Sequence, residues 1–178
     1  MAQVFLTSDL HLGHKNLIES HLNMSVDKHL FLLIENWNNV VKKEDLVYIL
    51  GDVAMERYNS CVDMFFQNTK GRKYLIAGNH DNWKLIKTLY DNSFIQKIYG
   101  CLPYKGFLLT HCPIEIKEII DGNRQLCRGN IHGHIHDLEK NKRLDSKFYY
   151  NVNIAFHDFK PVKFTDIEEH FKTLRNEI

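Results

Sequence analysis

Residues 46 to 52 have the sequence Leu-Val-Tyr-Ile-Leu-Gly-Asp, an apolar run that ends in a glycine and a carboxylate. A short continuous apolar run of this kind is typical of a strand buried on both faces. Residues 73–77 form a second such run before Gly78 and Asn79, and residues 58–68 between the two carry apolar side chains at helical spacing. The order strand, helix, strand predicts an α/β fold with parallel strands.

The same arrangement recurs at three other places along the chain. Residues 4–6, 106–110 and 130–131 each read as a strand, and they precede Asp9, His111 and the Gly133-His134 pair respectively. In open α/β sheets, sites form where the carboxyl ends of the strands meet. We therefore expect polar side chains that are distant in sequence to converge at one place.

The other segments complete one packed unit. Residues 27–41 have the stripe of an amphipathic helix, and a further helix is expected after Asp81. Residues 148–154 and 161–164 read as strands, and residues 165–175 as a closing helix in which Thr165 and Glu168 have the spacing of a capping box. Because no repeat or flexible linker interrupts the sequence, we expect a single domain over residues 1–178.

Charge and composition exclude several classes of partner. The chain has 23 Lys and Arg against 22 Asp and Glu, a formal charge of +1, which predicts no extended surface for duplex nucleic acid or an anionic membrane. A small phosphate substrate remains compatible with this charge. Without a secretory signal or a membrane-spanning run, we expect a cytoplasmic protein. The four cysteines form no C-x-x-C pair, and only Cys112, beside His111, adjoins a candidate site residue.

The polar residues after the strands make a mixed oxygen and nitrogen ligand set without thiolates, which suits one or two divalent first-row cations better than a structural zinc. Asp9 and His11 are two residues apart, so on a strand both would point to one face. Asp52 has two carboxylate oxygens and is the candidate bridge between two cations. The remaining candidate metal ligands are Asn79, His111, His134 and His136.

Five blocks in order, D-x-H from Asp9, G-D from Gly51, G-N-H-D from Gly78, His111 and G-H-x-H from Gly133, resemble the calcineurin-like metallophosphoesterase superfamily. Asn151-Val152-Asn153 and residues 159–162 resemble its small single-domain bacterial and phage members. The resemblance implies an α/β fold, the four-layer α/β/β/α sandwich of the metallophosphoesterase type. It also implies two metal positions, the first held by Asp9, His11, Asp52 and His136 and the second by Asp52, Asn79, His111 and His134.

The resemblance further implies hydrolysis of phosphodiester bonds by a metal-bound hydroxide. It places His80 beside the substrate as the general acid, with Asp81 orienting the imidazole. The expected cofactors are two divalent metal ions, with Mn²⁺ preferred over Fe, Zn²⁺, Ni²⁺ or Co²⁺, and the expected partner is a small phosphate ester or nucleotide. Phosphomonoesterase or nucleotide pyrophosphohydrolase activity is the alternative, and so is a non-catalytic metal-binding scaffold of the same fold.

Two further residues are candidates for substrate binding. His14 follows His11 by three residues and is expected either to approach the substrate phosphate or to support the metal ligands from behind. Arg57 could contact phosphate, although an exposed surface arginine is the more ordinary interpretation. Arg57 lies one place later than the arginine in the G-D-x-x-D-R-G motif of the serine/threonine protein phosphatases, which disfavours a phosphoprotein substrate. The sequence leaves the oligomeric state open.

Overall fold

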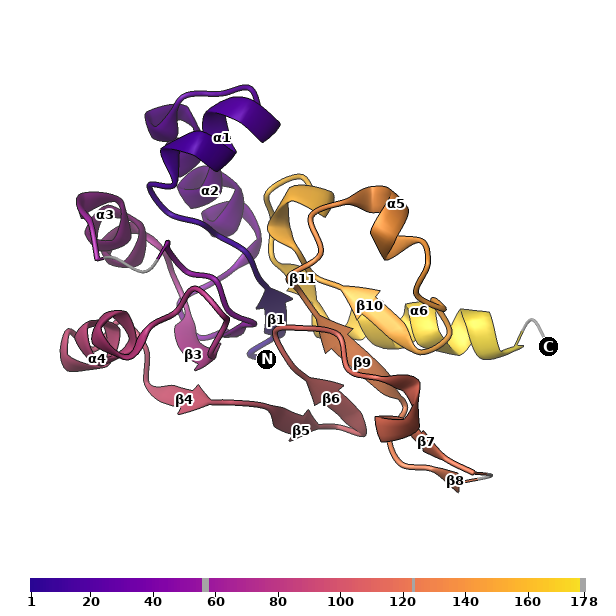
Figure 1. Ribbon diagram of the computed structural model, residues 1–178. Helices are drawn as coiled ribbons and strands as arrows, with labels where there is room; N and C mark the ends of the chain where they lie inside the picture. The colour runs from indigo at the N-terminus through magenta and orange to yellow at the C-terminus, as the bar shows by residue number, and fades with distance from the viewer. Residues whose placement is uncertain (56–57, 123, 177–178) are drawn as a thin grey trace.

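The computed structural model describes residues 1–55, 58–122 and 124–176, and it contains two main β-sheets (Figure 1). The larger sheet has five strands in the order β11-β1-β2-β3-β4. Strands β1 to β4 are parallel to one another, and β11 pairs antiparallel with β1. The strands are β1 (Val4–Thr7), β2 (Leu46–Ile49), β3 (Arg72–Ile76), β4 (Lys97–Tyr99) and β11 (Val162–Lys163).

The second sheet has four strands in the order β10-β9-β6-β5. Strands β6, β9 and β10 are parallel, and β5 is antiparallel to β6. A separate two-stranded hairpin joins β7 and β8. These strands are β5 (Leu102–Tyr104), β6 (Phe107–Leu109), β7 (Ile120–Asp121), β8 (Arg124–Gln125), β9 (Gly129–His132) and β10 (Tyr149–Asn151).

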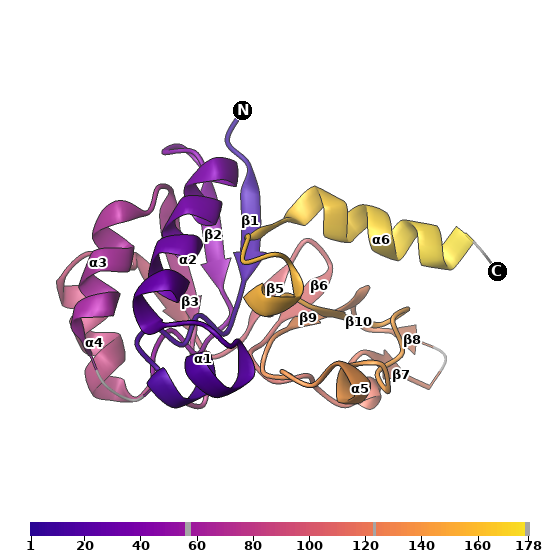
Figure 2. The same cartoon turned by 90° about the horizontal axis from the view of Figure 1, so that it is seen from above.

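Helices α2, α3 and α4 cover the outer face of the five-stranded sheet, and α6 lies against the four-stranded sheet (Figure 2). The α-helices are α1 (Lys15–His21), α2 (Val26–Val40), α3 (Ser60–Asn68), α4 (Trp83–Asp91), α5 (Leu138–Asn141) and α6 (Phe164–Asn176). Two 3₁₀ turns, Ile116–Glu118 and Ile154–Phe156, lie in the connections. The expected α/β class with two sheets flanked by helices is confirmed.

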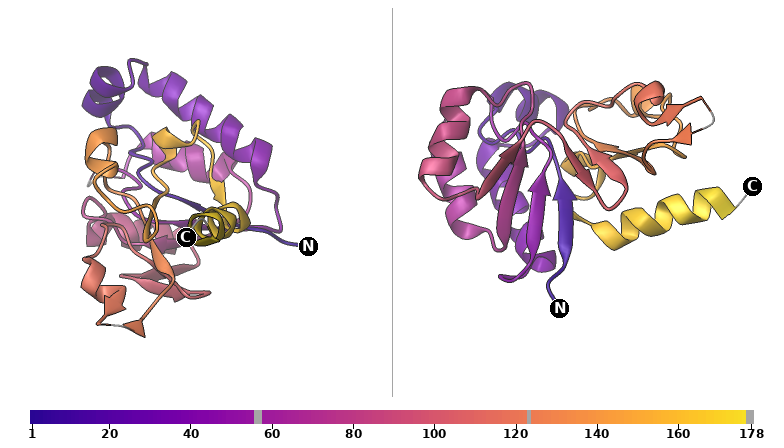
Figure 3. Two further views of the ribbon diagram at one scale, coloured as in Figure 1. Left: turned by 90° about the vertical axis from the view of Figure 1, so that its right-hand side faces the viewer. Right: turned by 90° about the horizontal axis from the view of Figure 1, so that it is seen from below.

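Figure 3 shows the helices and the two sheets from two further sides. Two clusters of buried apolar side chains lie between these layers. The first fills the space between the helices and the five-stranded sheet, where the ring of Trp37 meets that of Phe65 edge to face at 5.2 Å. The second lies between the sheets, where the ring centroids of Tyr48 in β2 and Tyr104 in β5 are 5.2 Å apart. Apolar side chains of α6 also pack into this cluster. Burial of these faces is the main stabilising contribution, and it fixes the two sheets relative to one another.

Side-chain caps begin the helices on the five-stranded sheet. Ser25 accepts a hydrogen bond from the Lys28 amide at the start of α2, and Asn59 caps α3 in the same manner. The helix expected over residues 27–41 is confirmed as α2. The capping box expected at Thr165 is wrong, because α6 begins at Phe164 directly after β11 and places Thr165 inside its first turn.

Among the described residues, no helix combines the length and apolar character that crossing a lipid bilayer requires.

Candidate metal centre

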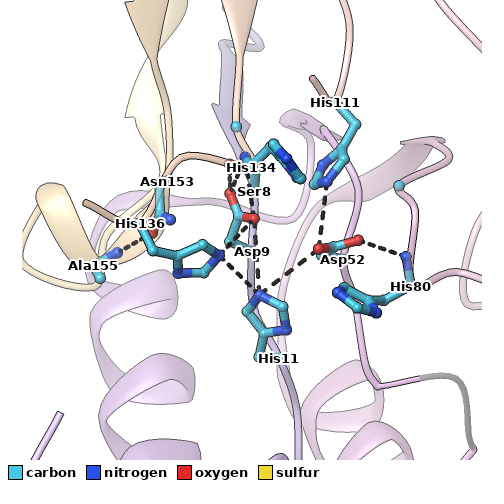
Figure 4. Close-up of polar contacts among 12 residues, drawn as sticks. Ser8, Asp9, His11, Asp52, His80, His111, His134, His136, Asn153 and Ala155 are labelled. Atoms are coloured by element: carbon cyan, nitrogen blue, oxygen red, sulfur yellow. Dashed lines mark hydrogen bonds and ion pairs between the residues drawn. The ribbon is translucent and has the colours of Figure 1, made fainter. Parts of the chain in front are cut away.

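The candidate ligands follow strands of both sheets and meet where those strands end (Figure 4). In the five-stranded sheet, β1 leads to Asp9, β2 to Asp52 and β3 to Asn79. In the other sheet, β6 leads to His111 and β9 to His134. Because the strands that lead into the site run parallel within each sheet, their carboxyl ends lie on the same edge. The two edges face each other across the site.

Four candidate ligands lie in the left-handed region of backbone conformation. The φ angles are 59° at Asp9, 43° at His11, 54° at Asp52 and 67° at His134. The expectation that Asp9 and His11 share a face of a strand is therefore wrong, because β1 ends at Thr7 and both follow it in a loop. Two backbone bonds hold this loop against the Asp52 loop, from Asp9 N to Gly51 O and from His11 N to Asp52 O, each 3.0 Å. Strained backbone that is held by its surroundings is typical of functional sites.

Asp9, His11 and His136 form the first group of potential ligand atoms. His136 Nε2 lies 3.2 Å from Asp9 Oδ1 and 3.1 Å from His11 Nε2. Burial lowers the pKa of His11 to about 4, despite the nearby charges of Asp9 and Asp52, so its imidazole is neutral at pH 7. The structure thus places one carboxylate and two imidazoles within reach of a single cation.

A second group surrounds Asp52 and His111. His111 Nε2 lies 3.3 Å from Asp52 Oδ2 and 2.8 Å from Asn79 Oδ1. The ring of His134 meets that of His111 edge to face at 5.1 Å, and Cys112 Sγ lies within 4.8 Å of the ligand nitrogens of both histidines. The carboxylate of Asp52 also faces the first group, with Oδ2 3.8 Å from His11 Nε2. Asp52 is therefore in position to bridge the two groups.

The hydrogen bonding of His111 shows that this donor set fits a cation. Its Nδ1 lies 2.8 Å from the carbonyl oxygen of Leu50, which can only accept, so Nδ1 carries a hydrogen. In a neutral imidazole Nε2 is then a lone pair, and it faces two further acceptor oxygens, Asp52 Oδ2 and Asn79 Oδ1. Three electron-pair donors at one point require a proton or a metal ion between them. Burial disfavours the charged form of His111, but its hydrogen bond to Asp52 outweighs burial and raises its pKa.

Asp52 is ionised at neutral pH. Burial raises its pKa, but the hydrogen bond and charge of His111 and the amide of His80 outweigh this, so that the pKa is lowered to about 2. Its Oδ1 accepts a hydrogen bond from the His80 amide at 3.0 Å, which leaves Oδ2 directed at the two histidines. The side chain is therefore held in one orientation before any ligand binds.

The contacts of Asp81 differ from the expected pairing with the His80 imidazole. Its Oδ2 accepts hydrogen bonds from the amides of Asp52 at 2.8 Å and Gly78 at 2.9 Å, and its Oδ1 accepts one from Val53 at 2.9 Å. His80 Nδ1 is buried and has no hydrogen-bond partner among the described residues. Asp81 thus joins the loop after β2 to the loop after β3, and the interpretation that it orients His80 is wrong for this structure.

We expect Asp81→Asn to weaken metal binding at least tenfold and to lower stability by about 2 kcal/mol, because an amide cannot replace a carboxylate that accepts three N–H bonds. The matched control is Asp45→Asn, since buried Asp45 accepts amide bonds from Gln3 and Lys42 at 2.7 Å away from the site. It should lose stability and keep metal affinity. The measurements are metal titration and thermal unfolding; an unchanged affinity together with a lower kcat at saturating metal would instead support contact with His80.

The two candidate substrate residues have different outcomes. His14 lies half-buried at the start of α1, with its ring 6.0 Å from that of His11, so it lies beside the centre without joining a ligand group. His80 lies at the same centroid distance from His11. Arg57 lies outside the described residues.

Several residues that shape the site have no signal in the sequence. The Ser8 hydroxyl donates a 2.5 Å hydrogen bond to Asp9 Oδ2, and the amide of His134 donates to the same carboxylate at 3.0 Å. Asn153, which is 1 % exposed, lies beside this centre and its side-chain nitrogen has no partner among the described residues (Figure 4). The strand-like alternation around Asn153 indicated a sheet position, and the resemblance of Asn151-Val152-Asn153 to small superfamily members gave its side chain no role.

Two motif glycines permit the close approach of these loops. Gly51 has a φ of +85°, and a Cβ there would lie 2.6 Å from His111 Nδ1. A Cβ on Gly133 would lie 2.5 Å from Asp9 Oδ2. Both distances are shorter than van der Waals contact, so a side chain at either position would displace a candidate ligand.

Gly133→Ala should lower the free energy of unfolding by about 2 kcal/mol and abolish metal binding at the first group, because the added methyl overlaps Asp9. Gly100→Ala is the control, since a Cβ there has nothing within 4 Å. Thermal unfolding and metal content of the two variants would check this. Equal metal content in both variants would contradict the close approach at Gly133.

Comparison with known proteins agrees with this geometry. The sequence pattern of the calcineurin-like phosphoesterase family matches residues 2–176. The chain belongs to this family. Its phosphoesterase-like fold is also found in a crystal structure of a protein of unknown function, AQ665 from Aquifex aeolicus, with a TM-score of 0.73 and 27% identity over 95% of this chain and 99% of that one.

Relatives of this phosphoesterase family member occur in archaea and in phages. The uncharacterized protein MJ1445 of Methanocaldococcus jannaschii is 30% identical over 171 residues, 91% of this chain and 87% of that protein. The Gene 66 protein of Mycobacterium phage L5 is 40% identical over 84 residues, and that of phage D29 is 41% identical over 83. These matches span 46% of this chain and only 41% of each phage protein.

Proposed function

We propose that this protein is a phosphodiesterase that uses two divalent metal ions and acts on a small phosphodiester or nucleotide. The observation that carries the proposal is the position of Asp52, whose carboxylate lies between two groups of ligand atoms. Each group combines buried residues with an exposed histidine, His136 in the first and His134 in the second. Support also comes from the paired orientation of Asp52 and His111, which leaves lone pairs directed at one point.

The residues that would hold the ions are divided between the two groups. Asp9, His11 and His136 would hold the first ion, Asn79, His111 and His134 the second, and Asp52 both. When bound, such ions neutralise phosphate charge and make water nucleophilic near neutral pH. The mixture of carboxylate, amide and imidazole donors supports Mn²⁺, while Fe, Zn²⁺, Ni²⁺ and Co²⁺ accept the same donors.

His80 would donate a proton to the leaving oxygen, and His14 would contact the phosphate. His80 follows the candidate ligand Asn79. Its backbone N–H donates a hydrogen bond to Asp52, which holds its backbone beside the centre, while its imidazole belongs to neither group of potential ligand atoms. A general acid must lie near the reacting atoms, and its nitrogen must not be bound to a metal ion. The half-buried position of His14 beside His11 supports a contact at the same edge of the site.

The test is hydrolysis of bis-p-nitrophenyl phosphate by EDTA-treated protein after addition of Mn²⁺, with p-nitrophenyl phosphate as the monoester comparison. Metal-dependent turnover of the diester, faster than that of the monoester, is the expected result. Faster turnover of the monoester would favour the phosphomonoesterase alternative. Two bound ions without turnover of either ester, or of a nucleoside diphosphate derivative, would favour a metal-binding scaffold.

A further inference from the structure

A pocket of about 620 Å³ adjoins the first group of candidate ligands. Asp9, His11 and His136 contribute to its lining. The rest of the lining comes from helices α1, α2 and α5 and from the segment after β10, which lie around the same end of the molecule in Figure 1. A molecule bound at the metal centre through its phosphate could therefore extend directly into this pocket.

The side chains that line the pocket are mainly apolar, and two of them are phenylalanine rings. Leu22, directly after α1, and Leu138 of α5 line it together with Phe156 and Phe159 from the segment after β10. Leu138 is 56% exposed, so its side chain is accessible to a molecule in the pocket. Walls of this composition favour an apolar or aromatic group over a second charged phosphate.

Two side chains in the lining have polar atoms that make no hydrogen bond within the described part of the chain. Asn153 is 1 % exposed, and its Nδ2 makes no hydrogen bond within the described part of the chain, while its Oδ1 accepts one from the Ala155 amide. His29 is 2% exposed and meets the Phe159 ring edge to face at 5.8 Å, and no hydrogen bond of its imidazole is found among the described residues. Burial lowers the pKa of His29 to about 4, so the ring is neutral and offers one donor and one acceptor.

We infer that this pocket binds a nucleobase-like heteroaromatic ring, carried by the group that stays on phosphorus when the ester is cleaved. This deepens the proposed phosphodiesterase function and rests on it. A planar heterocycle packs against Phe156 and Phe159 and pairs with the free polar atoms of His29 and Asn153, whereas an aliphatic chain would leave those atoms unpaired at a cost. The proposed proton donor His80 would lie beside the leaving group, and it is not among the described residues that line the pocket. The pocket is therefore assigned to the group that stays on phosphorus.

The test uses a series of esters that share the leaving group p-nitrophenolate, so that only the retained group varies. Thymidine 5′-(p-nitrophenyl phosphate) should be cleaved with a kcat/KM at least about tenfold above that of methyl p-nitrophenyl phosphate, and the hexyl ester should stay close to the methyl ester. Equal values for the thymidine and methyl esters would overturn the inference and leave the phosphodiesterase proposal intact. A preference for the hexyl ester would assign the pocket to aliphatic groups and also overturn it.

Two variants locate the effect. Ala155→Leu enlarges a side chain of the pocket lining and should lower kcat/KM for the thymidine ester much more than for the methyl ester, which removes the thymidine preference. Leu138→Ala removes an exposed wall and should reduce the preference about threefold to tenfold, whereas Leu126→Ala, at an exposed leucine outside the lining, should have no effect. Slower cleavage of every ester by Ala155→Leu, with unchanged metal content, would place the leaving group in the pocket instead.

A binding measurement separates failure of the pocket from failure of the catalytic proposal. Isothermal titration of the metal-free protein with thymidine should show binding that Leu138→Ala weakens and Leu126→Ala does not. If no ester is cleaved but thymidine binds in this manner, the pocket assignment stands and the phosphodiesterase proposal fails. Absence of thymidine binding, together with absence of ester preference, would overturn the pocket assignment.

Discussion

Asp52→Asn should lower kcat/KM for a phosphodiester by roughly 1,000-fold and leave less than one metal ion per chain, the largest effect expected of a single substitution. The His80 amide donates to Oδ1 of Asp52, so the amide oxygen of asparagine would turn toward that hydrogen bond. Its NH₂ group would then replace Oδ2 opposite His111 and His11. A donor group in that position cannot bind a cation, and the bridging charge is lost as well.

The fold should tolerate this substitution. Asparagine has nearly the same volume as aspartate and is among the residues that accept the left-handed backbone found at position 52. Asp45→Asn again serves as a buried control remote from the site and should keep wild-type metal content. Metal analysis after dialysis, kinetics with saturating Mn²⁺ and thermal unfolding would be measured on both. Two tightly bound ions and wild-type turnover in Asp52→Asn would refute the bridging role.

His80→Ala should reduce turnover without reducing metal content, which distinguishes it from every ligand substitution. For a phosphodiester with an alkoxide leaving group we expect a loss of about 100-fold to 1,000-fold, because the leaving oxygen then departs without a proton. With p-nitrophenolate, which leaves readily without a proton, the loss should be about tenfold. The hydrogen bond to Asp52 comes from the backbone N–H of residue 80, so it survives the substitution and the candidate metal ligands keep their positions.

The control for His80→Ala is His170→Ala, which removes a histidine on α6 that packs against Tyr150 far from the ligand groups. Its turnover with both leaving groups should match the wild type. An equal loss with both leaving groups in His80→Ala would indicate that His80 stabilises phosphate charge and does not donate the proton. Unchanged turnover with both would remove His80 from the catalytic proposal.

Several strands, and the placement of the candidate ligands directly after them, could be predicted because they depend on local patterns. Continuous apolar runs such as residues 46–50 can be stable only when buried on both faces, which predicts parallel strands inside an α/β fold. The strands β2, β3 and β6 were expected and are present within a residue or two at their ends. Where each run is followed by an aspartate, asparagine or histidine, parallel topology brings the side chains of each sheet to one edge, and the packing of the two sheets then places the two edges opposite each other.

The roles of Asp81 and of the first loop could not be predicted, because each depends on contacts between distant segments. The motif around His80 places Asp81 next to the imidazole in sequence, but its carboxylate is taken by amides of the loop that ends β2. Asp9 and His11 have the spacing of one strand face, yet their backbone is left-handed, held by bonds to the Asp52 loop some 40 residues away in sequence. Local propensity has no information about such bonds.

For this protein, the linear pattern of apolar runs and ligand-type residues is sufficient to specify the fold class, the family and the candidate ligands. The reason is that each apolar run must be buried as a strand, and the ligand-type residue that follows it then lies at the carboxyl end of that strand. The pocket beside Asp9 is different. Its walls come from α1, α2, α5 and the segment after β10, and neither His29 nor Asn153 has neighbours in sequence that indicate a binding role. Only packing of these segments around one space makes them a candidate recognition site, since a cavity exists only between elements that the chain has already brought together.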